Sequence, residues 1–293
     1  MKNKVPFILV SVCVIAAGIF VMMTKGFNFG VDFKGGVKLV TQFSDETSEG
    51  NLREILEPLE LGEVQVVSFG RKADNQFLIK VKHHEGREIS QEVSGKLRES
   101  HPTVTILSEE TVGAKVGGEL RRKGFFALIL ASILILVYVG IRFDFLFAPG
   151  AVLALVHDVL VPTSIFAFLG LEINLPILAA ALTIIGYSIN DTIVIYDRIR
   201  ENLRKLPPSL PLTDLIDRSL TETLSRTIVT SLTVFFAVLV LYLLGGAVLK
   251  DFSFYMLIGV VAGTYSTLFI ATPTYLLLCQ LFPKKGLMRR SHN

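Results

Sequence analysis

The sequence predicts a polytopic α-helical membrane protein with six transmembrane helices and a small ferredoxin-like α+β extracytoplasmic domain between helices one and two. Hydrophobic residues make up 51% of the 293 residues and charged residues only 19%, which is too apolar for a soluble protein of this length. Six stretches are long and apolar enough to cross a bilayer, which takes roughly 20 residues. One charged stretch, residues 32–123, instead contains short segments with strand and helix periodicity.

Each of the six apolar stretches predicts one transmembrane helix. Four carry no charged residue, the third contains His157 and Asp158, and the fourth contains Asp191. The first follows Lys2 and Lys4, but it is longer than a signal-peptide core and lacks a small-residue cleavage site, so an uncleaved anchor is expected. The predicted spans are Val5–Thr24, Gly124–Ile141, Phe145–Leu171, Ile173–Tyr196, Thr227–Leu249 and Phe252–Pro283.

The lysines and arginines of the short loops predict that both termini are cytoplasmic. They gather before helix one, in the loop 197–226, and in the tail at Lys284, Lys285, Arg289 and Arg290. The basic run 121–123 disagrees, because it precedes helix two on the outer side, but translocated domains weigh little in this rule. The predicted organisation is residues 1–26 as the cytoplasmic N-terminus and helix one, residues 27–123 as the extracytoplasmic domain, and residues 124–293 as helices two to six with a cytoplasmic loop and tail.

The outer domain is predicted from segments in the order β-α-β-β-α-β, the ferredoxin-like arrangement. These segments are Val37–Phe43, Asn51–Leu61, Val64–Phe69, Phe77–Lys82, Ile89–Arg98 and Val104–Leu107. His83, His84 and Glu85 have the side chains of metal ligands, but a solvated loop is the preferred interpretation. No metal site, no cofactor site and no catalytic residue is predicted, and the two cysteines lie in apolar stretches that indicate no disulfide.

A further helical pattern lies in the loop 197–226. After a proline-rich break, apolar residues recur at helical spacing at Leu212, Leu215, Ile216 and Leu220, with polar residues between them. Two interpretations remain open. The segment is either an amphipathic helix along the inner membrane surface or a cytoplasmic helix packed against the bundle.

Ionisable residues inside the predicted spans are functional candidates, because each costs roughly 2.5–3.5 kcal/mol at the centre of a membrane helix. His157 and Asp158 fall about ten residues into helix three, near the midplane. Asp191, beside Asn190 in a polar stripe of helix four, lies close to the boundary where Arg226 opens helix five, so these two charges are expected to approach each other. A carboxylate between desolvation and a guanidinium is suited to binding and releasing a proton; a fixed ion pair that only specifies packing is the alternative.

Two stretches resemble signatures of the SecD/SecF protein-export family. Residues 30–36, GVDFKGG, resemble a G-x-D-F-x-G-G motif shared by both subunits, with the motif residues Asp32, Phe33, Gly35 and Gly36. Residues 186–194, GYSINDTIV, followed by Asp197 and Arg198, resemble the fourth-helix signature of SecF in particular. The His157-Asp158 pair and residues 225–227 are also similar to SecF, so the resemblance covers essentially the whole chain.

This resemblance implies a function. SecF belongs to the RND transporter superfamily, pairs with SecD beside the SecYEG channel, and uses the proton motive force to promote preprotein export across the bacterial cytoplasmic (inner) membrane. Proton coupling is then expected at Asp191 and Arg226, with protons as the coupling ion and no cofactor. The implied partners are SecD, SecYEG, the translocating preprotein and membrane lipid, with no nucleic acid. The glycine motif at Asp32–Gly36 is interpreted as a close-packed turn.

Two other functions remain open. One is an RND-type exporter half for a small molecule or lipid, although such proteins usually carry larger outer domains. The other is a scaffold subunit that stabilises a translocon without moving protons. An enzyme is not expected, because the hydrophilic segments contain no paired nucleophile and base and no phosphate-binding loop.

Overall fold

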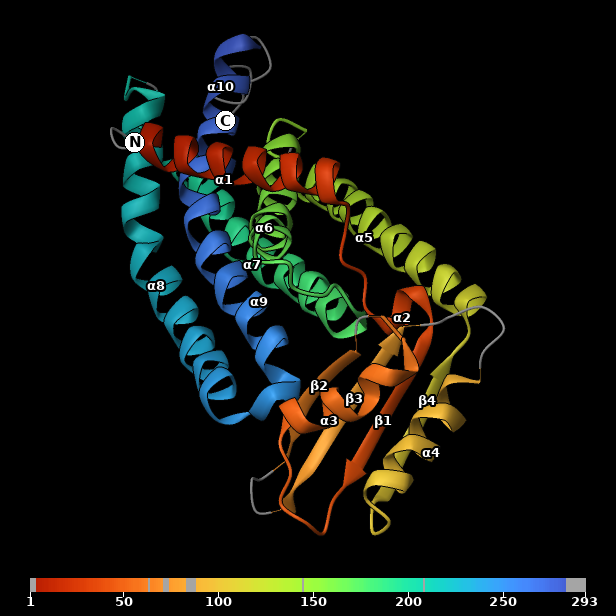
Figure 1. Ribbon diagram of the computed structural model, residues 1–293. Coiled ribbons are helices and arrows are strands. Elements are labelled where there is room, and N and C mark those ends of the chain that lie inside the picture. Colours follow the sequence, from red (N-terminus) through yellow and green to blue (C-terminus); the bar gives the residue numbers. More distant parts are fainter. Residues whose placement is uncertain are drawn as a thin grey trace.

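The computed structural model describes residues 4–62, 64–70, 74–82, 88–143, 145–207 and 209–282. Within these residues six helical segments are long and apolar enough to cross a membrane, as predicted. They form a bundle with the α+β domain at one end (Figure 1). The spans are α1 (Lys4–Lys25), α5 (Ala114–Arg142), α6 (Ala148–Leu169), α7 (Leu175–Lys205), α8 (Leu212–Leu244), and a last span made of α9 (Gly246–Ser266), a π turn η3 (Thr267–Ala271) and α10 (Thr272–Leu281).

The expected start of helix five at Thr227 is wrong, because α8 already begins at Leu212. The amphipathic segment of the loop 197–226 is therefore the first turns of this helix. Its Leu215 and Ile216 are fully buried in one cluster with Tyr196 of α7. The interpretation as a helix packed against the bundle is confirmed, and the helix along the membrane surface is wrong, because the apolar stripe is covered by protein.

The α+β domain has the predicted strand and helix order. Its sheet runs β2-β3-β1-β4, with all neighbouring pairs antiparallel, which is the ferredoxin-like arrangement. Alternate strand residues such as Leu39 and Ile79 point into a core that α3 and α4 cover on one face. The elements are β1 (Gly36–Gln42), α3 (Glu49–Leu56), β2 (Val64–Phe69), β3 (Gln76–Lys82), α4 (Ile89–Ser100) and β4 (Thr105–Val112).

Several residues of the sequence predictions lie outside the described part of the chain. These are the candidate metal ligands His83, His84 and Glu85, and the terminal basic residues Lys2, Lys284, Lys285, Arg289 and Arg290. Among the described residues no group of three metal-binding side chains forms a site.

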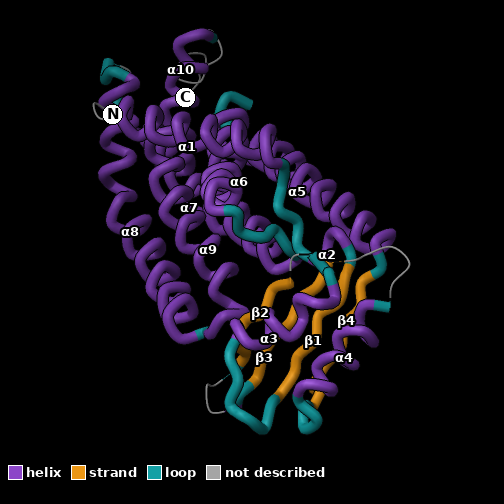
Figure 2. The backbone as a smooth tube through the Cα atoms, in the orientation of Figure 1, coloured by secondary structure: helices purple, strands orange, loops and turns teal. Residues whose placement is uncertain are grey.

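At the junction between the domain and the bundle, the loop that leads from α1 to the short helix α2 (Val31–Lys34) meets the loop that joins α6 to α7, as Figure 2 shows. The loop after α1 and the loop after α6 lie side by side: Phe29 and Ile173 form a parallel β-bridge, and the Gly30 N–H donates to the Ile173 carbonyl at 3.0 Å. Because two distant segments share backbone hydrogen bonds here, α1, α7 and the sheet leave this junction in fixed directions.

Close helix contacts around α9 depend on glycine. A Cβ at Gly259 would lie 2.0 Å from the Ile184 side chain, and one at Gly263 would lie 3.2 Å from Ser188 Cβ. Both neighbours belong to α7, so the small residues bring the two backbones together. Further along, the π turn η3 precedes Pro273. In a regular α-helix the proline ring would clash with the preceding turn, and the wider π turn avoids this clash.

Candidate functional site

A buried polar cluster lies at the centre of the bundle, around Asp158 at the midpoint of α6. The side chain of Asp158 is 0% exposed. Its Oδ2 accepts hydrogen bonds from the hydroxyl of Ser188 on α7 and, at 2.9 Å, from that of Ser266 on α9. Its Oδ1 lies 2.8 Å from His157 Nδ1. Both carboxylate oxygens are thus bonded, which is how a charge is held in a water-poor interior.

The cluster continues towards α1 through a chain of side chains. The Tyr265 hydroxyl lies 3.0 Å from His157 Nε2 and 2.9 Å from the Ser11 hydroxyl. Ser11 and His157 also line a cavity of about 420 Å³ between α1, α6 and the last span. Hydrogen-bonding groups therefore run from this cavity beside α1 to Asp158. Such a chain can hold or pass a proton, because imidazole and hydroxyl groups both donate and accept.

Asp191 on α7 has a different environment. It is 2% exposed, and its Oδ1 accepts one hydrogen bond, at 3.3 Å, from the Thr230 hydroxyl of α8. Its Oδ2 is buried and has no hydrogen-bond partner among the described residues. A charged carboxylate oxygen that is buried without a hydrogen-bond donor carries a desolvation cost of about several kcal/mol. Asp191 is therefore the less satisfied of the two buried carboxylates.

The close approach of Arg226 to Asp191 that the sequence predicts is not observed. Arg226 is exposed, and no ion pair joins it to Asp191 within the part of the chain that the structure describes. At this contact α8 presents Thr230, one turn beyond Arg226, so the threonine hydroxyl and not the guanidinium contacts Asp191. Asn190, next to Asp191, is also exposed.

A charged cluster joins the ends of α7 and α8 that lie far from the α+β domain. These helices have 31 and 33 residues, more than the roughly 20 that a span requires, so this cluster lies outside the membrane-spanning segments. Glu222 accepts hydrogen bonds from Arg198, Asn202 and Arg218, at 2.7, 2.8 and 2.9 Å. These donors, Arg198 foremost, lower the pKa of Glu222 to about 2. Of the predicted motif residues, Arg198 thus fastens α7 to α8, while Asp197 is exposed.

The glycine motif joins the domain to the bundle. Asp32 is 4% exposed; its Oδ1 pairs with Lys38 of β1, and its Oδ2 accepts the Leu175 N–H of α7 at 3.1 Å. Gly35 and Gly36 have φ values of +84° and +148°, and a Cβ at Gly36 would lie 2.2 Å from the Val81 carbonyl oxygen. The predicted close-packed turn is observed. Phe33 is buried beneath it.

Sequence reasoning missed the hydroxyl groups that bind the two buried carboxylates and His157. They are Ser188 and Ser266 at Asp158, Thr230 at Asp191, and Tyr265 at His157. The hydroxyls lie on α7, α8 and α9, whereas the charges lie on α6 and α7, so only the packing brings them together. A usable signal is present nonetheless, since Ser188 and Thr192 are small polar residues one turn apart in an apolar stretch, close to Asp191.

These features define a class: a polytopic membrane protein whose helices enclose hydrogen-bonded carboxylates and whose ferredoxin-like domain is fixed to helix α7. Two family models match the chain. The model of the C-terminal region of the SecD/SecF protein export membrane proteins covers residues 92–280, and that of the SecD/SecF GG motif covers residues 20–46. The chain belongs to the SecD/SecF protein-export family.

Curated relatives agree along nearly the full chain. The protein translocase subunit SecF of Calditerrivibrio nitroreducens is 40% identical over 91% of this chain and 89% of its own length. That of Vibrio alginolyticus is 38% identical over 92% and 86%. The protein translocase subunit SecDF of Thermus thermophilus is 40% identical over 88% of this chain but only 35% of its own length.

The fold matches solved structures of the same family. The crystal structure of SecDF from Thermus thermophilus, described as a translocon-associated membrane protein, superposes with a TM-score of 0.79 at 37% identity, over 94% of this chain and 38% of that one. SecDF in a super-membrane-facing form superposes with a TM-score of 0.72 at 35% identity, over 99% and 40%. This chain thus corresponds to about two fifths of the SecDF chain.

Proposed function

We propose that this chain is a SecF-like subunit of the Sec translocase that pairs with SecD and uses the proton motive force to promote preprotein export at the SecYEG channel. One observation carries the proton-coupling part: Asp191 is buried in a membrane helix with a carboxylate oxygen that has no hydrogen-bond partner among the described residues. The pairing is supported by the SecDF relatives, in which the part similar to this chain belongs to one longer chain.

In this proposal the two buried carboxylates have separate roles. Asp158 has three hydrogen-bonding neighbours and holds α6, α7 and α9 together. Asp191 takes up and releases the proton. Neutralising it removes a charge that, among the described residues, receives one side-chain hydrogen bond, from the Thr230 hydroxyl. A proton that crosses the membrane potential contributes about 2.3 kcal/mol per 100 mV, enough to shift an equilibrium between two helix arrangements.

Arg226 acts in the second arrangement. The Thr230 hydroxyl also contacts the Arg226 carbonyl at 3.0 Å, so the two residues are one turn apart on α8. A rotation or shift of α8 exchanges Thr230 for the Arg226 guanidinium beside Asp191. That exchange favours the charged carboxylate and hence proton release, because an opposite charge stabilises the ionised form.

The proposed setting is the bacterial cytoplasmic membrane, with both termini in the cytoplasm and the α+β domain outside. The support is the distribution of lysine and arginine in the short loops. The charged cluster at Glu222 then lies at the cytoplasmic ends of α7 and α8, and the domain is placed where a preprotein leaves the channel.

The test is gradient-dependent preprotein export in vesicles that contain this chain with its SecD partner. Asp191→Asn is expected to co-purify with the partner and to lose the stage that depends on the proton gradient. Asp214→Asn, which makes the same change at an exposed carboxylate in the first turn of α8, serves as the matched control. If Asp191→Asn assembles and exports like the wild type under a gradient, the proton-coupling proposal is refuted and a scaffold role replaces it.

A further inference from the structure

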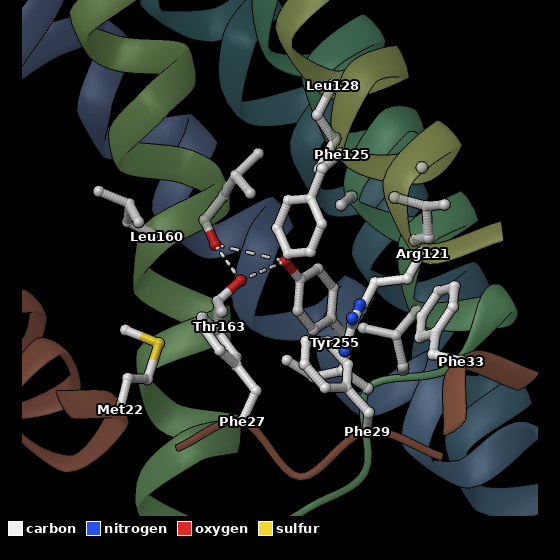
Figure 3. Close-up of a pocket in the computed structure, with 16 residues that line it drawn as sticks. Met22, Phe27, Phe29, Phe33, Arg121, Phe125, Leu128, Leu160, Thr163 and Tyr255 are labelled. Atoms are coloured by element: carbon white, nitrogen blue, oxygen red, sulfur yellow. Dashed lines mark hydrogen bonds between the residues drawn. The ribbon is translucent and has the colours of Figure 1, made fainter. Parts of the chain in front are cut away.

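An apolar cavity of about 170 Å³ opens where α1 ends and α5 begins. Figure 3 shows its walls, which α1, α5, α6, α7 and α9 supply together with the loops at the domain junction. Its inner end is closed by buried side chains such as Phe33, Ile177 and Tyr255, whereas Phe27 and Phe125 near its mouth are 36% and 46% exposed. The cavity therefore runs from the surface of the bundle to its interior.

The walls of this cavity offer a ligand almost no free hydrogen-bonding group. Its two hydroxyls bond each other, with Thr163 Oγ1 lying 2.8 Å from the Tyr255 hydroxyl, and Thr163 also donates to the Val159 carbonyl at 2.7 Å. A comparable apolar cavity of about 150 Å³ binds benzene. The cavity thus suits a hydrocarbon segment of roughly six carbons.

One cation lies on the cavity wall, and two more follow it on α5. The Arg121 guanidinium lies over the Phe29 ring, 5.2 Å from its centroid, on the cavity wall. Arg122 and Lys123 follow on α5 and are exposed. None of these three cations forms an ion pair with a carboxylate in the described segments. They stand immediately before Gly124, where the apolar part of α5 starts, so they lie at the level of lipid head groups.

We propose that this cavity binds an anionic phospholipid of the leaflet next to the α+β domain. One acyl chain enters between Phe27 and Phe125, and the phosphate contacts Arg121, with Arg122 and Lys123 adding attraction. Charge and shape agree on this occupant, because an apolar slot with Arg121 on its wall and two exposed cations at the same level of α5 matches a lipid with an anionic head group and a hydrocarbon tail. The proposal also explains why a basic run stands where the charge rule for loops does not expect one. It is independent of proton coupling.

The expected selectivity follows from the three charges. A basic side chain near an anionic membrane surface favours binding by about 1 kcal/mol, or roughly a fivefold preference for an anionic over a zwitterionic lipid. Removing Arg122 and Lys123 together should therefore lower the preference for an anionic over a zwitterionic lipid by more than tenfold. Blocking the slot should abolish it although the charges remain.

Because the chain has no tryptophan, a single introduced tryptophan reports the site without background. Phe125→Trp places it at the mouth. Phe168→Trp, at a 72% exposed phenylalanine near the end of α6, is the matched reporter away from the cavity. The full-length reporter proteins are reconstituted in nanodiscs that contain phosphatidylglycerol or phosphatidylcholine with brominated acyl chains at equal mole fraction, and quenching is measured.

The expected result is stronger quenching by brominated phosphatidylglycerol than by phosphatidylcholine at Phe125→Trp, and equal quenching at Phe168→Trp. Arg122→Gln with Lys123→Gln should reduce the difference, and Leu178→Phe, which adds volume to the cavity wall, should remove it. Equal quenching by both lipids at Phe125→Trp refutes the site. A preference that survives Leu178→Phe in a folded protein also refutes it, since only surface charge then attracts the lipid.

Discussion

Removing the Asp32 carboxylate tests the connection between the α+β domain and α7. The first turn of a helix leaves its backbone N–H groups without helical partners. At the start of α7 each of the first three residues avoids an unpaired N–H group. Leu175 donates to Asp32 at 3.1 Å, Pro176 has no N–H, and Ile177 donates to the Asn174 side chain at 3.1 Å. Asp32→Ala therefore orphans the Leu175 N–H and also leaves Lys38 without its partner.

The magnitude follows from these two contacts. A hydrogen bond to a charged group contributes about 1.5–3 kcal/mol, and a negative charge at a helix N-terminus adds about 0.3–1 kcal/mol. Lys38 is 24% exposed, so it partly recovers hydration. The net cost of Asp32→Ala at the junction is about 2–3 kcal/mol. Asp32→Asn keeps an acceptor and should cost about half of that.

The assay is amide hydrogen exchange of the full chain in nanodiscs, followed in peptides that cover residues 28–36 and 173–180. A loss of about 2 kcal/mol in local opening free energy speeds exchange roughly 30-fold. Asp32→Ala should show this change in both segments, and Asp32→Asn a smaller one. Glu46→Gln, an exposed carboxylate of the same domain, is the control. Unchanged exchange at the start of α7 in a folded Asp32→Ala protein refutes the reasoning.

Two further predictions concern the bundle. Phe147 is 2% exposed and stacks on Tyr275 with ring centroids 3.9 Å apart, so Phe147→Ala should cost about 3–5 kcal/mol and lower the thermal midpoint, whereas Phe145→Ala at a 79% exposed ring should not. Glu222 has a pKa of about 2, below its ordinary 4.5, so its stabilising effect is complete above pH 4.5 and is lost as the pH falls towards 2. Glu222→Gln should flatten the dependence of the thermal midpoint on pH over this range. An unchanged slope of midpoint against pH contradicts the assignment.

The positions of the membrane spans and the strand order were predictable because both follow from local periodicity. The helix ends were not. The first turns of α8 carry Asp214, Asp217 and Arg218, so their helical pattern was separated from the apolar span, yet Leu215 and Ile216 are buried in a cluster with Tyr196 of α7 and the helix is continuous. These polar residues belong to the part of the long helix α8 that extends beyond the apolar span.

The candidate site was predictable only in part. Ionisable residues are easily recognised in apolar stretches, so His157, Asp158 and Asp191 could be chosen from the sequence. Their partners could not, because a serine or threonine in a membrane helix commonly bonds its own backbone. The contact of Asp32 with Leu175 joins positions 143 residues apart, and no local pattern carries that information.

The fixed start of α7 has a mechanical consequence. This helix is continuous from Leu175 to Lys205, so it acts as a rigid lever of about 45 Å whose pivot lies at the glycine motif. Asp191 lies 16 residues along it, roughly 24 Å from the pivot. A tilt of about 10° there displaces Asp191 by roughly 4 Å and the Arg198 end by about 6 Å. In the proposed mechanism, a small reorientation of the ferredoxin-like domain would therefore supply the movement that exchanges Thr230 for Arg226 beside the buried carboxylate.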